Sequence, residues 1–143
     1  MDGIWMNTAL VARPRGGDTE KLTINLGVVD LGRIDLLVDE GFYSNRSDLI
    51  RTAIRNQLSA HEQTVTASVA RRSLVLGLRD IDSDELEALE AEGRMLDLRV
   101  VGLARIDASV SASLARATIR SVKVLGAFHA SAAVRKALAD RIA

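Results

Sequence analysis

The chain has 143 residues, of which 48% are hydrophobic and 3% aromatic, and its 19 Lys and Arg residues balance its 19 Asp and Glu residues. This length suits one or two small domains with a core of aliphatic side chains. The zero net charge argues against unspecific coating of nucleic acid, which needs a large positive excess, but it leaves specific binding open. Because there is no cysteine, disulfides and Cys-based metal or catalytic sites are excluded.

Residues 1–19 lack hydrophobic periodicity and contain Pro14 and the pair Gly16-Gly17, so we interpret them as a flexible arm. Asp2 comes early and no long apolar run follows it, so we expect neither a signal peptide nor a membrane span. The protein is therefore predicted to be cytoplasmic. The sequence leaves open whether translation starts at Met1 or at Met6.

Residues 21–26 alternate polar and apolar side chains, which is the period of a half-buried strand. The apolar face would consist of Leu22, Ile24 and Leu26. The polar face would consist of Lys21, Thr23 and Asn25. A lone strand leaves its backbone groups unpaired, and no second strand is expected before residue 73. The simplest partner is the same strand of a second chain, which predicts an antiparallel two-stranded ribbon on a twofold axis.

Two amphipathic helices are predicted after the strand. The first ends at Gly41, because glycine suits the left-handed position that terminates a helix. Ser44 is the predicted N-cap of the second helix, where its side chain would accept a hydrogen bond from a following amide. The hydrophobic residues that complete the predicted dimer core are Leu31, Ile34, Leu49, Ile50 and Ile54. Helical spacing continues over residues 59–72, which we interpret as an extension or linker.

Residues 20–58 resemble the ribbon-helix-helix family of CopG- and Arc-type regulators. The resemblance is carried by the strand, the Glu40-Gly41 turn and the segment Tyr43-Ser44-Asn45-Arg46-Ser47-Asp48-Leu49-Ile50-Arg51, in that order. It implies an intertwined β-α-α dimer that binds double-stranded DNA, with the polar strand face reading bases. It also implies that the start of the second helix, Ser44, Asn45, Arg46 and Ser47, holds a phosphate. Gly27 departs from the family, which often has proline or another helix starter there, so the first residue of the first helix stays open.

The chemistry of the polar strand face is compatible with base reading. A β-ribbon fits the major groove, where Asn25 can bond adenine bidentately and Lys21 can reach guanine. The amides and positive dipole end of a helix N-terminus suit a phosphate. The alternative is that Lys21, Thr23 and Asn25 form only the solvated face of a dimerisation strand.

Residues 73–143 contain a weak threefold repeat. Similar apolar runs occupy residues 74–81, 99–106 and 123–130, and their central glycines, Gly77, Gly102 and Gly126, are 25 and 24 residues apart. Such a period is typical of stacked supersecondary units, so each run is a predicted strand with a bend or bulge at its glycine. Helices are predicted over 84–92 after a Ser83 cap, over 111–118, and over 132–141 after a Ser131 cap.

The predicted fold class is α+β: a ribbon-helix-helix domain (20–58) followed by a small α/β domain of three β-α repeats with parallel strands (73–143). The second domain would serve oligomerisation or sensing, with a protein partner or a small ligand. His61 and His129 stand far apart without cysteine, and no phosphate-loop or nucleophile signature occurs. We therefore predict no metal, no cofactor, no catalytic residue and no enzymatic activity.

Three functions fit these features. The first is a sequence-specific DNA-binding regulator, a repressor, that forms a homodimer or a larger even-numbered oligomer and associates with the nucleoid when it binds DNA. The second is an antitoxin whose C-terminal part captures a toxin. The third is a structural protein whose repeats polymerise. The sequence identifies neither the operator nor a ligand of the second domain.

Overall fold

The computed structural model describes residues 19–143. The chain divides into two units, Lys21–Ser68 and a second that contains Glu20 and Val69–Ala143. We call the first the N-terminal unit and the second the repeat unit, and we describe each by itself.

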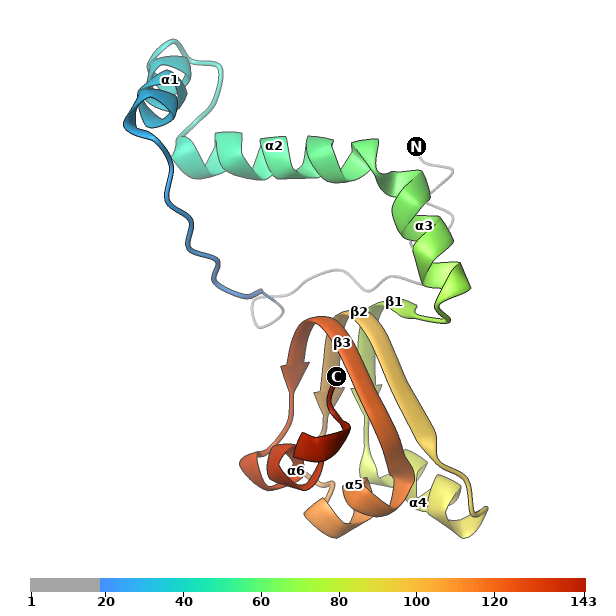
Figure 1. Ribbon diagram of the computed structural model, residues 1–143. Coiled ribbons are helices and arrows are strands. Elements are labelled where there is room, and N and C mark those ends of the chain that lie inside the picture. The colour runs from blue at the N-terminus through green and yellow to red at the C-terminus, as the bar shows by residue number, and fades with distance from the viewer. Residues whose placement is uncertain (1–18) are drawn as a thin grey trace. The chain divides into compact units, whose positions relative to one another are not determined.

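The N-terminal unit consists of an extended segment and helices. Residues 19–27 belong to no helix or strand, α1 spans Val28–Asp39, α2 spans Arg46–Ala60, and α3, Glu62–Arg71, begins in this unit. The structure of the single chain therefore does not assign the predicted strand 21–26, although Figure 1 draws the segment as an extended trace. A strand needs a partner backbone for its hydrogen bonds. Helix α1 starts directly after Gly27, which is its N-cap residue.

A glycine turn joins α1 to α2, as predicted. Gly41 has a φ of +87°, a conformation that costs a residue with a side chain about 1–2 kcal/mol. Its amide donates to the carbonyl of Val38 (3.0 Å), and the amide of Phe42 donates to that of Leu37 (3.0 Å). This is the paired hydrogen bonding of a Schellman motif, and it ends α1 just before the start of α2.

The repeat unit contains a parallel three-stranded sheet in the order β1-β2-β3, which confirms the predicted parallel strands. The strands are β1 (Val75–Ile81), β2 (Leu96–Ile106) and β3 (Ile119–His129), and each is followed by a short helix. Both β2 and β3 begin earlier than predicted. Polar residues near their starts obscure the apolar pattern, and only the paired strands bring Asp97 of β2 against Arg120 and Ser121 of β3.

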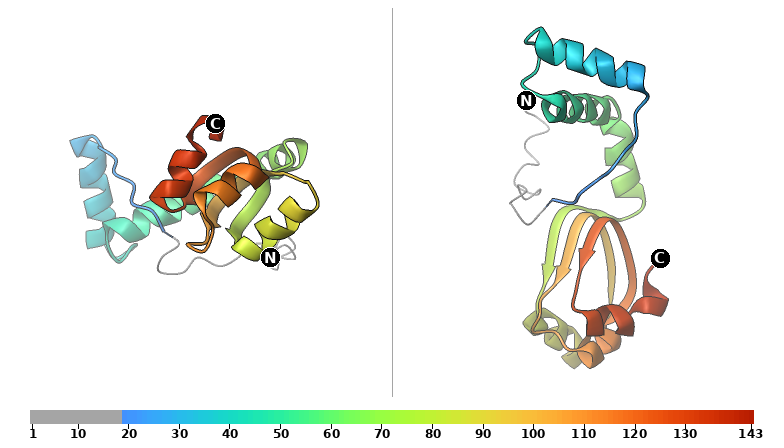
Figure 2. Two further views of the ribbon diagram at one scale, coloured as in Figure 1. Left: turned by 90° about the horizontal axis from the view of Figure 1, so that it is seen from below. Right: turned by 90° about the vertical axis from the view of Figure 1, so that its left-hand side faces the viewer.

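The three central glycines lie side by side across the sheet, with Gly77 opposite Gly102 and Gly102 opposite Gly126. Their φ angles are +124°, +136° and +124°. A Cβ atom on Gly102 would lie 2.1 Å from the carbonyl oxygen of Gly77, and one on Gly126 equally close to that of Gly102. Figures 1 and 2 show the strands arching over sharply at one end of the sheet. The glycine row therefore accounts for a bend, while the ladder irregularity lies elsewhere, between Leu96 and Asp97.

The helices of the repeat unit are α4 (Ser83–Ala91), α5 (Ala112–Thr118) and α6 (Ala132–Ala137), with a 3-10 turn at Ala139–Arg141. The predicted Ser131 cap is confirmed, since its Oγ accepts from the amide of Val134 (3.2 Å). The Ser83 cap is wrong: Asp82 caps α4 by accepting from the amide of Glu85 (2.9 Å). Asp caps as well as Ser does, so the sequence did not show which residue leaves the helix in an extended conformation.

The core lies between the strands and these helices. Its buried hydrophobic side chains, taken from β1 to α6, are Ile81, Leu86, Leu98, Val100, Ala104, Ile106, Val110, Ala115, Ile119, Val122, Val134 and Leu138. The buried polar residue, Thr118, donates its hydroxyl to the carbonyl of Leu114 (2.7 Å), so it is satisfied. A fully buried aliphatic side chain contributes about 1.5–3 kcal/mol, so this set is ample for a small domain.

Groups from the chain's C-terminal end cover much of the outer edge of β3. Ile142 forms a parallel bridge with Val122, and the amide of Ala143 donates to the Val122 carbonyl (2.8 Å). The guanidinium of Arg135 donates to the Phe128 carbonyl and lies over that ring, 5.3 Å from its centroid. Such covering protects an edge strand from pairing with another chain.

Candidate nucleic-acid interface

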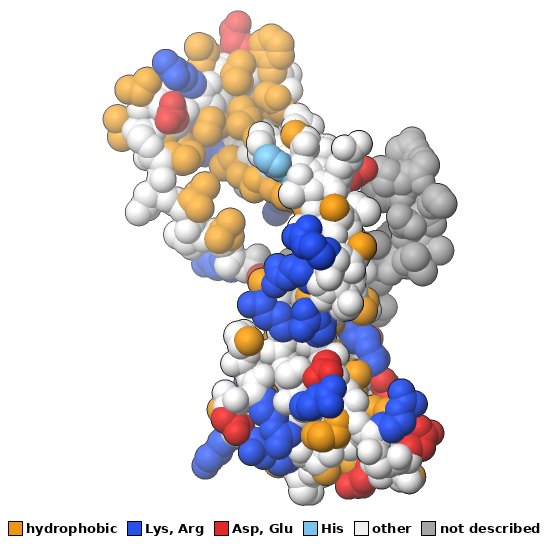
Figure 3. All heavy atoms as spheres, turned by 45° about the vertical axis from the view of Figure 1, so that its right-hand side comes forward, with side chains coloured by type: hydrophobic (Ala, Val, Ile, Leu, Met, Phe, Trp, Pro, Cys, Tyr) orange, Lys and Arg blue, Asp and Glu red, His pale blue; other side chains and the backbone are white. Residues whose placement is uncertain are grey.

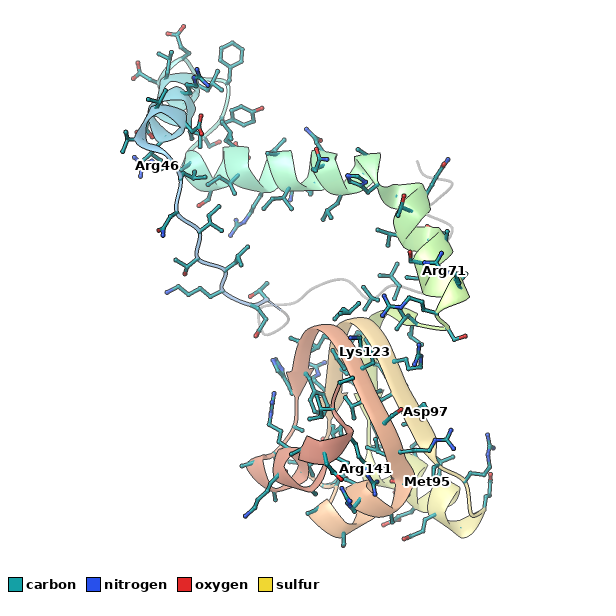
Figure 4. All side chains as sticks on the ribbon, in the orientation of Figure 1. Arg46, Arg71, Met95, Asp97, Lys123 and Arg141 are labelled. Atoms are coloured by element: carbon teal, nitrogen blue, oxygen red, sulfur yellow. The ribbon has the colours of Figure 1, made fainter. Side chains whose placement is uncertain are left out.

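The predicted base-reading residues, Lys21, Thr23 and Asn25, lie in the extended segment and are all exposed. They alternate with hydrophobic residues that are exposed as well: Leu22 is 77% exposed and Ile24 54%. Figure 4 shows side chains projecting from both sides of this segment. The segment therefore carries a row of polar side chains and a row of hydrophobic side chains, and both rows are exposed to solvent.

The start of α2 is organised by Asn45 and Asp48. Asn45 is the N-cap, because its Oδ1 accepts from the amide of Asp48 at 2.8 Å. The Asp48 carboxylate in turn accepts from the amide of Ser44 at 2.9 Å. The prediction that Ser44 caps α2 is therefore wrong by one residue. Of the predicted phosphate site, the amides of Arg46 and Ser47 occupy the first helical positions, where an intrahelical acceptor is lacking.

The side chain of Arg46 is held by α1. Its Nε and Nη2 atoms donate to the two carboxylate oxygens of Asp35, each at 2.8 Å. This hydrogen bonding, supported by the opposite charges, raises the pKa of Arg46 and lowers the pKa of Asp35. The two residues are eleven positions apart, so the sequence pattern did not reveal the pair. It fixes the start of α2 to α1, and it occupies the guanidinium of Arg46 within the chain.

The predicted dimer-core residues are not buried within one chain. Helices α1, α2 and α3 contain no buried residue, and Ile54 is 44% exposed. Further exposed hydrophobic residues of this unit lie outside the predicted dimer core, namely Val28, Val29, Leu36, Leu37, Phe42, Leu58 and Val65. Figure 3 shows hydrophobic side chains gathered on the surface of this unit. Apolar surface of this extent marks an interaction site.

A hollow of about 680 Å³ lies at the carboxyl ends of the strands, the place where parallel sheets commonly bind ligands. Several of its charged side chains are already engaged by neighbouring groups of the chain. Arg105 Nε donates to Asp80 at 2.8 Å, and His129 Nε2 lies 3.4 Å from a carboxylate oxygen of Glu20. Hydrogen bonds from Ser109 lower the pKa of Asp107. These contacts favour no particular ligand, so the expected small ligand or protein partner of this domain stays a prediction.

Residues 19–143 contain neither a cluster of potential metal ligands nor a helix of membrane-spanning length and hydrophobicity. Within this range no three His, Cys, Asp or Glu side chains are grouped so that they could hold a metal ion. His61 instead lies 3.2 Å from the side-chain nitrogen of Gln57. No helix in the same part of the chain has the length and hydrophobicity needed to cross a bilayer.

Comparison with known proteins gave one finding. The model of the Ribbon-Helix-Helix transcriptional regulator family matches residues 17–135. The match extends beyond the resembling stretch 20–58 and includes the three strands of the repeat unit. No curated protein and no solved structure matches the chain.

Proposed function

The chain belongs to the Ribbon-Helix-Helix transcriptional regulator family, and on this basis we propose that it is a dimeric, sequence-specific DNA-binding repressor. Two chains pair their Lys21–Leu26 segments as an antiparallel ribbon, and this ribbon enters the major groove. Lys21, Thr23 and Asn25 then read base edges. In this ribbon, the segment of the second chain supplies hydrogen-bond partners for the unpaired backbone of residues 21–26.

The observation that carries this proposal is the exposure of the N-terminal unit. None of its helices buries a side chain, although the hydrophobic residues follow helical spacing. A second copy of the same unit would cover Leu22, Ile24 and Leu26 together with the apolar faces of α1 and α2. Dimerisation is thereby the step that gives this unit a core.

The phosphate contact of the proposal is placed at the start of α2. The amides of Arg46 and Ser47, with the positive end of the helix dipole, suit one phosphate oxygen each. The Asn45–Asp48 cap and the Arg46–Asp35 ion pair hold these amides in position. Because the contact is made by the backbone, it positions the ribbon without selecting a sequence.

The repeat unit is proposed to join dimers or to sense a signal. A dimer bound across a promoter excludes other proteins, which is repression in its simplest form, and it places the protein at the nucleoid. Regulators of this family are generally not enzymes, and we propose no catalytic site.

The two alternatives from the sequence gain no support. An antitoxin tail that folds on its toxin would lack a core of its own, whereas the repeat unit has one. Polymerisation by continuing the sheet would need an open β3 edge, and groups from the C-terminal end cover much of that edge.

The test compares DNA binding of the wild type with that of the double variant Thr23→Ala/Asn25→Ala. Gel shifts would use the DNA upstream of the protein's own gene, and duplexes selected from a random library would supply a site if that DNA does not bind. Each lost base contact should cost about 1–3 kcal/mol and relax preference at one position per half-site.

The matched control is Asn56→Ala/Thr64→Ala, which removes the same residue types from exposed positions of α2 and α3. It should bind as the wild type does. Equal affinity and an unchanged footprint for Thr23→Ala/Asn25→Ala would contradict base reading by the strand. Failure of the random library to yield any enriched sequence would contradict the proposed function as a whole.

A further inference from the structure

Three cationic residues of the repeat unit lie close together in space. Arg99 of β2 and Lys123 of β3 are register partners and therefore share one face of the sheet, opposite the core face of Val100. The guanidinium of Arg99 donates through Nε and Nη2 to the carbonyl of Arg72, at 3.1 and 2.7 Å. We call Arg72, Arg99 and Lys123 the basic cluster. Figure 4 shows Lys123 near the arched end of the sheet.

The charge of this cluster is compensated only in part, through the electrostatic interaction of Asp97 with Arg99. Five other arginines of the repeat unit form ion pairs, namely Arg79–Glu85, Arg94–Glu92, Arg105–Asp80, Arg116–Asp140 and Arg120–Asp97. Within residues 19–143, no such pair includes a member of the basic cluster, and the acceptor of Arg99 is a neutral carbonyl. The neighbouring carboxylate, Asp97, is already bound by Arg120 and Ser121.

Local excess charge of this kind is conspicuous in a chain whose net charge is zero. A group of cations costs folding free energy through mutual repulsion unless a polyanion neutralises it. Figure 3 shows Lys and Arg side chains gathered on the surface of the repeat unit. Duplex DNA carries one negative charge for about every 1.7 Å of its axis, so it is the polyanion that a DNA-binding protein meets at highest density.

We propose that the basic cluster binds the phosphate backbone of DNA beside the site that the ribbon reads. The inference rests on the proposed function, and it assigns to the repeat unit a direct, sequence-independent contact with DNA. Arg72 follows the N-terminal unit by only four residues, since that unit ends at Ser68. Once the ribbon is bound, the cluster meets the flanking phosphates as an intramolecular event at high effective concentration.

The experiment measures affinity against salt concentration for Arg72→Gln/Lys123→Gln. Arg99 is left intact because its guanidinium supports the carbonyl of Arg72. The slope of log K against log salt should become shallower by about 0.9 for each phosphate contact removed, hence by about 1.8 per subunit for two contacts. The wild type should also gain affinity when the duplex is extended beyond the ribbon site, and the variant should gain none.

The matched control is Arg94→Gln/Lys136→Gln, which removes two exposed cations from other parts of the same unit. Its slope should equal that of the wild type. The charge-preserving variant Arg72→Lys/Lys123→Arg should retain the wild-type slope, which separates loss of charge from loss of fold. Equal slopes for Arg72→Gln/Lys123→Gln and for its control would overturn the inference.

The outcome is distinguishable from failure of the proposed function. Thr23→Ala/Asn25→Ala should lose sequence preference yet keep its salt slope on unspecific DNA, because the basic cluster is intact. If the wild type shows no sequence preference but its slope still depends on Arg72 and Lys123, base reading fails and the phosphate contact holds. If the wild type shows sequence preference but its salt slope does not depend on Arg72 and Lys123, base reading holds and the phosphate contact fails.

Discussion

The two units differ in how far a single chain buries their hydrophobic side chains. The repeat unit buries a continuous aliphatic core, whereas no helix of the N-terminal unit buries a residue. Both are rich in Leu, Ile and Val, so hydrophobicity alone does not explain the difference. The repeat unit contains three strands that pair with one another, and its helices close over them. The N-terminal unit contains one extended segment and no second strand.

This difference predicts two kinds of stability. A core that one chain completes should unfold at a temperature independent of protein concentration. A core that needs two chains should follow mass action, with its midpoint rising as concentration rises. The proposed dimer thus makes the N-terminal unit the concentration-dependent part of the molecule.

Ile24→Asp should abolish the dimer, because it places a charge in the proposed interface without a partner. The helices of the N-terminal unit should lose their order while the repeat unit stays folded. Light scattering after size exclusion, with amide hydrogen exchange to locate the folded residues, checks both expectations.

Thr23→Asp is the matched control for that change, since it adds the same charge to the opposite side of the strand. It should remain a dimer and lose DNA binding through repulsion from phosphates. A stable Ile24→Asp dimer, or a Thr23→Asp monomer, would contradict the proposed ribbon.

Gly102→Ala should destabilise the repeat unit and spare the N-terminal unit. The new Cβ would meet the Gly77 carbonyl oxygen at 2.1 Å, and the φ of +136° is strained for alanine. Backbone strain and overpacking cost about 1–3 kcal/mol each, so a loss of about 2–6 kcal/mol is expected in urea unfolding.

Gly93→Ala separates the two causes. Gly93 also has a positive φ, +67°, but nothing lies within 4 Å of its added Cβ. Its cost should be limited to about 1–2 kcal/mol of backbone strain. Similar losses for both variants would show that the close approach of the glycine row contributes nothing.

The Asp97–Arg120 pair predicts a small pH effect confined to the repeat unit. The hydrogen bond from Arg120, followed by that from Ser121, lowers the pKa of Asp97 from 3.8 to about 2. Because the folded-state pKa is depressed, the stabilisation is complete above the unfolded value and is lost as pH falls from about 4 to about 2.

The measurement is the difference in thermal midpoint between the wild type and Asp97→Asn over that pH range. The difference should be largest above pH 4 and should shrink towards pH 2. A difference that does not change with pH would mean that Asp97 acts through its shape and not through its charge. Salt should weaken the effect, since the pair is exposed to solvent.

The sequence supported the fold further than it supported the site. Three runs with central glycines predicted three parallel strands with a bend, and Gly41 predicted the end of α1. The caps at Ser44 and Ser83 were misplaced because an Asx residue beside each serine competes for the same role. The starts of β2 and β3 were missed because Asp97 and Arg120 interrupt the apolar pattern.

Local periodicity determined the helices, the glycine turns and the positions of the repeat strands along the chain, because these depend on residues a few positions apart. The family resemblance over 20–58 likewise rested on contiguous residues. Contacts between distant positions were decided only by the tertiary structure. Arg46 meets Asp35 through the turn between two helices. The register of the sheet pairs Arg99 with Lys123, and a hydrogen bond from Arg99 to the carbonyl of Arg72 adds the third residue. The physical reason is that the pairing of two distant residues depends on the backbone conformation of every residue between them. A short sequence pattern does not contain this information.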